Sequence, residues 1–233
     1  MLFKNKSIDE KVIKNIGLNF SKSNTNYIHK IKKVIKKPWG YEYCYFSNKK
    51  LALWVLTLKS KQSTSMHAHL KKKTFLINTK SITFSDLNNR YKIKPNTILK
   101  IDKRTFHQSL NLSNKDIIIF EIEIPNDKLD LLRFKDKYSR DKTLYEKKII
   151  RNNRIEGLRK KINKKYLDIF LGRKKNKAKI NKNDIVLLLN GKLVINKKRI
   201  PLYTPTKMRK NYDLIKYLNF DHLTNFISIK IND

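Results

Sequence analysis

From residue 27 to residue 124 the chain is a series of short apolar segments separated by turn residues. The longest apolar stretch has eight residues, whereas a membrane-spanning helix needs about twenty, so we expect no membrane insertion. Short segments at this spacing are typical of an all-β sandwich or barrel. We predict strands in six of them: Leu51 to Leu58, Thr74 to Ile77, Ser81 to Phe84, Tyr91 to Ile93, Thr97 to Ile101 and Ile117 to Ile124.

Two histidines lie on one face of another expected strand. His67 and His69 are separated by one residue, and residues i and i+2 of a strand point to the same side. His107 follows a later apolar segment and is placed to supply a third imidazole. Three neutral imidazoles with one open position hold Zn²⁺, Fe²⁺ or Mn²⁺ in catalytic sites. We therefore predict these three histidines as metal ligands, and leave open a metal-free pocket in which they only form hydrogen bonds.

Four separated pieces of the sequence resemble one known family in content and order. The family pattern is a KPWG-like opening segment, a TSxHxH strand, an I-P-x-G-x-x-H turn and a closing run D-hydrophobic-hydrophobic-R-x-x-D-x-Y-G-R. The corresponding pieces here are Lys37 to Glu42, Thr64 to His69, Ile98 to His107 and Asp130 to Arg140. Together they resemble the cupins of type II mannose-6-phosphate isomerases and related cupins of surface-polysaccharide synthesis, over roughly residues 34 to 142.

The resemblance implies a fold and a class of ligand. The fold is a cupin (jelly-roll) barrel, here with flanking helices, and the ligand is a sugar phosphate or nucleotide sugar of carbohydrate metabolism. As an enzyme the protein would be an isomerase or epimerase. The alternative is a non-catalytic sugar-binding or regulatory module. The resemblance also implies pairing of two copies as a homodimer.

The chain departs from the family pattern near each histidine piece. Members with the full metal set carry a glutamate soon after the second histidine, where this chain has three consecutive lysines ending at Lys73. The turn before His107 has Asp102-Lys103-Arg104 in place of proline and glycine. An ammonium does not ligate a metal at neutral pH, so an inward Lys73 would repel one. A metal therefore requires that Lys73 points outward or contacts a substrate phosphate, and we assign it to substrate binding.

Four further residues are candidates for catalysis or substrate binding. Glu121 and Glu123 share one face of an expected strand, which either lines the barrel pocket or meets solvent. If they point inward, one is the natural general base for proton abstraction next to a carbonyl. Arg133 and Arg140 lie in the piece that resembles the closing motif, and guanidinium groups bind phosphate bidentately.

The domain boundaries follow from changes in pattern. We expect residues 1–26 to form a short helix, opened by the capping box Ser7 to Glu10, and a linker that includes Ser21 to Asn26. Residues 27–144 should form the barrel, and residues 145–233 a helix and a β-rich region. In the latter, Asn190-Gly191 between two apolar runs predicts a hairpin. This region is either a degenerate second cupin half, with only His222 as a histidine, or an unrelated β-extension.

The formal net charge of +36 invites a nucleic-acid function, because clustered Lys and Arg bind phosphate backbones. However, 45 of the 55 basic residues are lysines spread along the whole chain, and Asn and Ile are also abundant, which is the composition that an AT-rich genome imposes. We therefore rank nucleic-acid binding third, behind the enzyme and the sugar-binding module. The single cysteine, Cys44, rules out an internal disulfide framework, and the first residues contain no hydrophobic signal core, so we expect a cytoplasmic protein.

Overall fold

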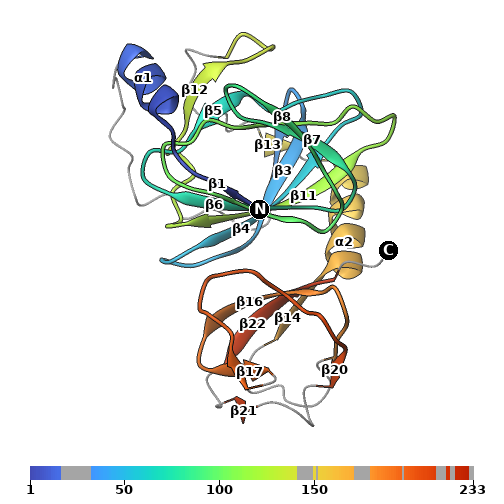
Figure 1. Ribbon diagram of the computed structural model, residues 1–233. Helices are drawn as coiled ribbons and strands as arrows, with labels where there is room; N and C mark the ends of the chain where they lie inside the picture. The colour runs from blue at the N-terminus through green and yellow to red at the C-terminus, as the bar shows by residue number, and fades with distance from the viewer. Residues whose placement is uncertain are drawn as a thin grey trace. The chain divides into compact units, whose positions relative to one another are not determined.

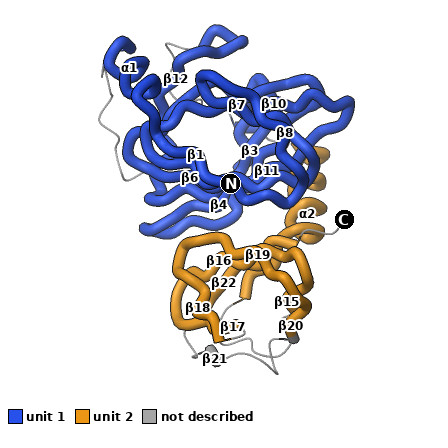
Figure 2. Tube along the Cα trace, viewed as in Figure 1, with its two compact units in different colours: residues 1–151 blue, residues 152–233 orange. Residues whose placement is uncertain are grey.

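The computed structural model describes residues 1–16, 33–140, 149–150, 152–170, 179–195, 197–213, 219–220 and 224–230. The chain divides into two compact units, residues 1–151 and 152–233 (Figure 2). No helix in the described ranges is long and apolar enough to cross a membrane. The predicted linker from Ser21 to Asn26 and the histidine at position 222 lie outside the described residues.

The first unit contains a large sheet (Figure 1). All neighbouring strands in it are antiparallel except the first two in the order below, which are parallel. Its strands, in spatial order, are β1 (Leu2–Phe3), β9 (Ile98–Ile101), β6 (Lys73–Asn78), β11 (Ile117–Ile124), β4 (Ala52–Leu58), β3 (Gly40–Ser47), β2 (Val34–Lys37) and β13 (Ile149–Ile150). The central strands are the most apolar, and every residue of β4 is buried.

Two smaller antiparallel sheets face the large one. They are β10 (Gln108–Leu110), β7 (Ile82–Ser85) and β8 (Arg90–Ile93), and the pair β12 (Leu132–Lys135) and β5 (Met66–Ala68). An isolated bridge between His67 and His107 joins the two. The buried core lies between the layers and combines Trp54 and Leu56 of the large sheet with Phe84 and Ile93 of the facing one. This arrangement is the predicted jelly-roll barrel, and all six predicted strands are present.

The direction of side chains on β11 decides which residues reach the barrel interior. Ile117 and Ile119 belong to the core between the sheets. Because side chains alternate along a strand, Glu121 and Glu123 continue on the same inner face. The alternative in which these two glutamates meet solvent is therefore wrong, and both are buried.

The predicted N-terminal helix is present as α1 (Ser7–Ile16). Its capping differs from the prediction, which paired Ser7 with Glu10. The Asp9 carboxylate instead accepts a hydrogen bond from the backbone N–H of Lys6 at 2.8 Å, one position earlier in the chain. Glu10 is thereby left to contact another part of the barrel, as described below.

The second unit begins with α2 (Asn153–Tyr166), whose N-cap Asn152 accepts hydrogen bonds from two backbone N–H groups. Its described strands form three small sheets around a separate apolar core. The strands are β14 (Leu167–Phe170), β15 (Lys179–Ile180), β16 (Ile185–Asn190), β17 (Leu193–Ile195), β18 (Lys198–Arg199), β19 (Thr206–Lys207), β20 (Tyr212–Asp213), β21 (Asn219–Phe220) and β22 (Asn225–Ile229).

The predicted hairpin at Asn190-Gly191 is wrong, although Gly191 has the backbone conformation expected for the turn. Gly191 adopts the positive φ of +75° that such a turn requires, and strands flank it on both sides. However, β16 pairs with β22 and β19, whereas β17 pairs with β18 and β21. The two strands therefore belong to different sheets and form no hairpin. Whether this unit is a degenerate second cupin stays a prediction.

Candidate functional site

The three predicted histidines meet inside the first unit. His67 lies on β5, His69 follows one residue after that strand ends, and His107 exchanges backbone hydrogen bonds of 2.8 and 3.1 Å with His67. Their ligand-capable ring nitrogens all lie within 4.8 Å of one another. The strand period of two brings His67 and His69 together, and the backbone bridge adds His107.

Each imidazole is oriented by a backbone carbonyl. The Nδ1 atoms of His67, His69 and His107 lie 2.8, 2.6 and 3.0 Å from the carbonyl oxygens of Ser65, Asp130 and Thr105. A carbonyl only accepts, so each Nδ1 carries the proton and each Nε2 keeps its lone pair. Holding the second ring nitrogen in this way is the usual support of a metal-binding histidine.

The charge state of the histidines fits a cation. Burial lowers the pKa of His107 to about 4, and burial lowers the pKa values of His67 and His69 well below their usual value. All three are therefore neutral at pH 7, as a metal requires of its ligands. The Nε2 atom of His69 is buried and has no hydrogen-bond partner among the described residues. A buried acceptor of this kind fits a metal ion, which would complete it.

No carboxylate joins the three histidines within the described part of the chain, in agreement with the missing glutamate. Lys73 is the first residue of β6, is partly exposed and does not line the pocket. Its neighbour Lys72 lines the pocket and is 1% exposed. The inward lysine near the histidines is therefore Lys72, one position before the residue that the family pattern indicates.

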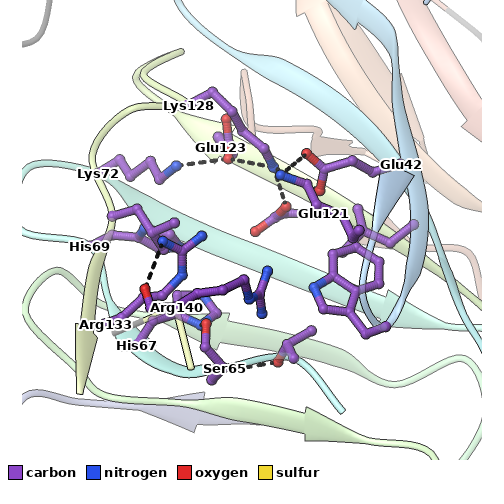
Figure 3. Close-up of a pocket in the computed structure, with 15 residues that line it drawn as sticks. Glu42, Ser65, His67, His69, Lys72, Glu121, Glu123, Lys128, Arg133 and Arg140 are labelled. Atoms are coloured by element: carbon purple, nitrogen blue, oxygen red, sulfur yellow. Dashed lines mark hydrogen bonds and ion pairs between the residues drawn. The ribbon is translucent and has the colours of Figure 1, made fainter. Parts of the chain in front are cut away.

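Lys72 belongs to a buried network of alternating charges (Figure 3). Its ammonium donates to Glu123 at 2.7 Å and to the backbone carbonyl of Asp127 at 2.9 Å. Lys128 lies 2.9, 3.3 and 3.6 Å from carboxylate oxygens of Glu121, Glu123 and Glu42. Burying these charges is tolerable only because each faces an opposite one.

The two glutamates of β11 have opposite electrostatic environments. Burial raises the pKa of Glu121, and the nearby Lys128 offsets only part of this effect. The pKa of Glu123 is about 2 because Lys128 and Lys72 together outweigh the burial that would raise it. Glu123 is thus a permanent anion at neutral pH, whereas Glu121 gains and loses a proton more readily. Two carboxyl groups whose environments separate their pKa values are a common acid and base arrangement.

Arg133 and Arg140 also face the pocket, and both are 7% exposed. Arg133 lies on β12 and donates to the backbone carbonyl of Arg140 at 3.5 Å. The guanidinium group of Arg140 is held by the Asp136 carboxylate through two bonds of 2.8 Å. Asp136 is the second of the two aspartates in the segment that resembles the closing motif, and it fixes this arginine at the wall of the pocket.

The pocket contains about 460 Å³ of space not filled by atoms, a volume that includes the solvent at its open mouth. Five basic and three acidic side chains line it, an excess of two positive charges when the histidines are neutral. His107 is outside the lining, but its ring lies 4.4 and 5.3 Å from those of His67 and His69. The lining residues are Lys37, Trp39, Glu42, Leu56, Thr64, Ser65, His67, His69, Lys72, Glu121, Glu123, Lys128, Leu131, Arg133 and Arg140.

Four charged residues of the pocket lining were absent from the predicted site: Lys37, Glu42, Lys72 and Lys128. Glu42 carries a signal in the sequence, because it is a lone acidic residue in the otherwise apolar and aromatic strand β3. Lys128 follows β11 in a polar turn, where a lysine is normally solvated. Its burial depends on ion pairs with Glu121 and Glu123 of β11 and, at a longer distance, with Glu42, which is distant in the sequence.

No family model and no curated protein matches this chain. Similar solved structures include a sugar phosphate isomerase of the cupin superfamily from Silicibacter pomeroyi, with a TM-score of 0.34 and 11% identity over 36% of this chain and 58% of that chain. KdgF from Halomonas has a TM-score of 0.37 and 10% identity, covering 40% of this chain and 87% of its own. Oxalate decarboxylase from Lactobacillus farciminis has a TM-score of 0.40 and 12% identity, covering 44% and 33%. At these identities the likeness concerns the fold alone.

Proposed function

We propose that this cupin-type barrel binds a divalent metal at His67, His69 and His107 and takes a sugar phosphate or nucleotide sugar in the adjoining pocket, which it isomerises or epimerises. The observation that carries the proposal is the arrangement of one pocket. Three neutral imidazoles, a carboxylate pair with separated pKa values and two buried arginines all line or adjoin the same space.

The three histidines would hold the metal through their Nε2 atoms, with Zn²⁺, Mn²⁺ or Fe²⁺ as candidates. Such an ion supplies Lewis acidity to a bound hydroxyl or carbonyl oxygen. The protein's own part is to keep all three rings neutral and fixed by the carbonyls of Ser65, Asp130 and Thr105.

Proton transfer belongs to Glu121 in this proposal. Isomerisation of an aldose to a ketose, and epimerisation next to a carbonyl, both require removal of a proton from carbon and its return. A carboxylate serves best when its pKa is near the working pH. Burial raises the pKa of Glu121, whereas Lys72 and Lys128 keep Glu123 ionised. Glu123 therefore serves to hold the two lysines, and Glu121 to move the proton.

The anionic end of the substrate would contact the two arginines of the pocket, Arg133 and Arg140. Arg133 presents a planar guanidinium group to the pocket, and this geometry suits phosphate oxygens. Arg140, two of whose nitrogens are held by Asp136, adds positive charge. The excess of positive charge among the lining residues favours an anionic ligand. Lys73 was predicted to contact the substrate phosphate, but it does not line the pocket. We therefore propose that lysines of the pocket lining make this contact instead.

The second candidate is a non-catalytic sugar-binding module. It is favoured by the lack of a carboxylate as fourth metal ligand in the described residues. It is also favoured by the ion pair of Lys72 with Glu123, which makes one of the two glutamates of β11 less able to take up a proton. In that case the pocket would recognise the same anionic sugars without exchanging their protons. A homodimer and a cytoplasmic location also remain predictions.

Proton exchange separates the two candidates. The purified chain, stripped with a chelator and reloaded with Zn²⁺, Mn²⁺ or Fe²⁺, would be incubated in D₂O with a panel of aldose and ketose phosphates. Deuterium uptake at the carbon next to the carbonyl, detected by NMR, supports the isomerase or epimerase. Metal-dependent binding of the same compounds without exchange supports the binding module. The absence of both metal uptake and sugar binding would overturn the proposal.

Two variants localise the activity. His69→Ala should abolish metal uptake, and Glu121→Gln should abolish exchange while leaving metal uptake and sugar binding intact. Lys73→Gln is the matched control, because this side chain lies outside the pocket lining and its loss should change neither property.

A further inference from the structure

The turn that carries His107 has an unusual backbone for its sequence. Arg104 adopts a positive φ of +62°, which residues with a Cβ rarely do. Neither glycine nor proline occurs between Asp102 and His107 to favour the turn. The backbone N–H of Arg104 nevertheless donates to the carbonyl oxygen of His69 at 2.6 Å, so this conformation joins the third histidine to the second. Another part of the protein must hold the turn in place.

The N-terminal segment supplies that support with three polar side chains. Asn5 donates to the backbone carbonyl of Arg104 at 2.7 Å. The Glu10 carboxylate accepts from two nitrogens of the Arg104 guanidinium, one of them at 2.6 Å. The Asp9 carboxylate, 2% exposed, accepts from the backbone N–H of Phe106 at 3.0 Å. These contacts bind the residues immediately before His107.

The same helix packs against the outer side of the histidine strand. Ile13, which is 1% exposed, belongs to an apolar cluster with Met66, Ala68 and Phe106. Met66 and Ala68 flank His67 on β5, so by strand alternation they point away from the metal site and toward α1. Figure 1 shows α1 beside β5 and β12. The helix thus contacts a direct neighbour of each of the three histidines.

We propose that the N-terminal segment from Asn5 to Ile13 is a positioning element for the metal site, in which Asp9 and Glu10 set the place of His107. It replaces the glycine and proline that the turn lacks. This inference rests on the proposed metal site. Asp9 and Glu10 touch neither metal nor substrate, and they act through the backbone and side chain of the turn.

The test measures metal affinity and ring geometry rather than turnover. Asp9→Asn and Glu10→Gln should each weaken Zn²⁺ binding, titrated calorimetrically into the chelator-treated full chain, by about 10- to 100-fold, as loss of outer-shell support does elsewhere. The ¹⁵N signals of the His107 ring should also shift in the metal-free protein. Lys11→Gln, an exposed change on the same helix, should alter neither measurement.

A double-mutant cycle isolates the turn from general loss of stability. Arg104→Gly removes the ion pair but supplies the residue that tolerates positive φ. Glu10→Gln should therefore weaken Zn²⁺ binding in the wild-type background and have no further effect in the Arg104→Gly background. If Glu10→Gln had an equal effect in both backgrounds, or if Asp9→Asn and Glu10→Gln each kept the full Zn²⁺ affinity, the positioning role would be overturned. The proposed function would remain intact. Failure of the wild-type chain to bind Zn²⁺ would overturn the metal site itself and this inference with it.

Discussion

Glu121 and Glu123 have the same chemistry and point the same way, yet the barrel shifts their pKa values in opposite directions. The difference is one of neighbours, since Glu123 forms ion pairs with both Lys72 and Lys128, whereas Glu121 is paired with Lys128 at 2.9 Å and is affected less strongly by Lys72. At the residue scale, the difference in pKa between the two glutamates therefore depends on the position of two lysines. Neither lysine is adjacent in sequence to the glutamate that it controls.

Replacing each glutamate by its neutral isostere should separate the structural role of Glu123 from the proposed catalytic role of Glu121. Glu123→Gln should lower the free energy of unfolding by about 3 kcal/mol, because it leaves the buried Lys72 without its carboxylate. Glu121→Gln should cost much less stability, since burial already disfavours its charge, but should lower any isomerase rate by about 10²- to 10⁴-fold. Urea denaturation and the deuterium-exchange assay measure the two effects, and a reversed order would contradict the assignment.

The buried histidines should make the metal-free barrel sensitive to mild acid. The pKa of His107 is about 4 in the folded protein and near 6.5 in the unfolded chain, so only the unfolded chain takes up a proton between these values. The contribution of the neutral His107 to the free energy of unfolding is therefore fully present above pH 6.5. It falls as the pH drops toward 4, by up to about 1.4 kcal/mol per pH unit for this one histidine. Denaturation in chelator at pH 7, 6 and 5 should show a shallower dependence in His107→Gln than in wild type.

The sequence predicts individual site residues where strand alternation carries the information. His67, His69, Glu121 and Glu123 share faces that a period of two identifies, and the structure brings all of them to the barrel interior. Lys73 illustrates the limit. Between His69 and β6 the chain crosses from one sheet to another, and alternation cannot be counted through such a loop, so the inward lysine is displaced by one position to Lys72.

At the scale of elements, one glycine fixes how β3 meets β4. Gly40 has a φ of +150°, and a Cβ at this position would lie 1.9 Å from the backbone carbonyl oxygen of Thr57 on the neighbouring strand. Backbone cannot move aside as a flexible side chain can. The close approach of these two strands beside Trp39, a pocket residue, therefore depends on the missing side chain.

Gly40→Ala should accordingly destabilise the first unit by at least about 2 kcal/mol. The matched control is Gly157→Ala in α2, where a Cβ would meet nothing within 4 Å. That change should stabilise the helix by about 0.5 to 1 kcal/mol, because alanine loses less conformational freedom than glycine. Urea denaturation of the two variants tests both signs, and a tolerated Gly40→Ala would mean that β3 and β4 separate easily.

Strand positions were predictable in the first unit because each strand is short, apolar and bounded by turn residues. The pairing of strands was harder to predict than their positions. The strands on either side of Asn190-Gly191, which join different sheets, are an example. A local turn signal reports the conformation of two residues, and Gly191 has the expected φ. It does not report which sheet the following strand joins, because β17 pairs with β18 and β21, and β21 lies far along the chain.

At the scale of the whole molecule, the net charge of +36 is the property most open to misreading. A polycation attracts any polyanion, so DNA binding at low salt is expected whatever the function. A dedicated nucleic-acid protein would instead place its basic residues on one face with side chains that contact bases. Here basic residues occur throughout both units, as expected if base composition of the gene explains the excess.

We therefore expect duplex DNA to bind with a dissociation constant no tighter than about 1 μM at physiological salt, without sequence preference, and with affinity falling steeply as salt rises. Single charge reversals at exposed lysines should act alike in the two units, because basic residues are spread along the whole sequence. Lys92→Glu on β8 in the first unit and Lys198→Glu on β18 in the second are matched, exposed changes. Fluorescence anisotropy at several salt concentrations measures both variants against wild type. If one reversal removed most of the affinity and the other none, the affected unit would contain a true nucleic-acid site, and the charge would be functional rather than compositional.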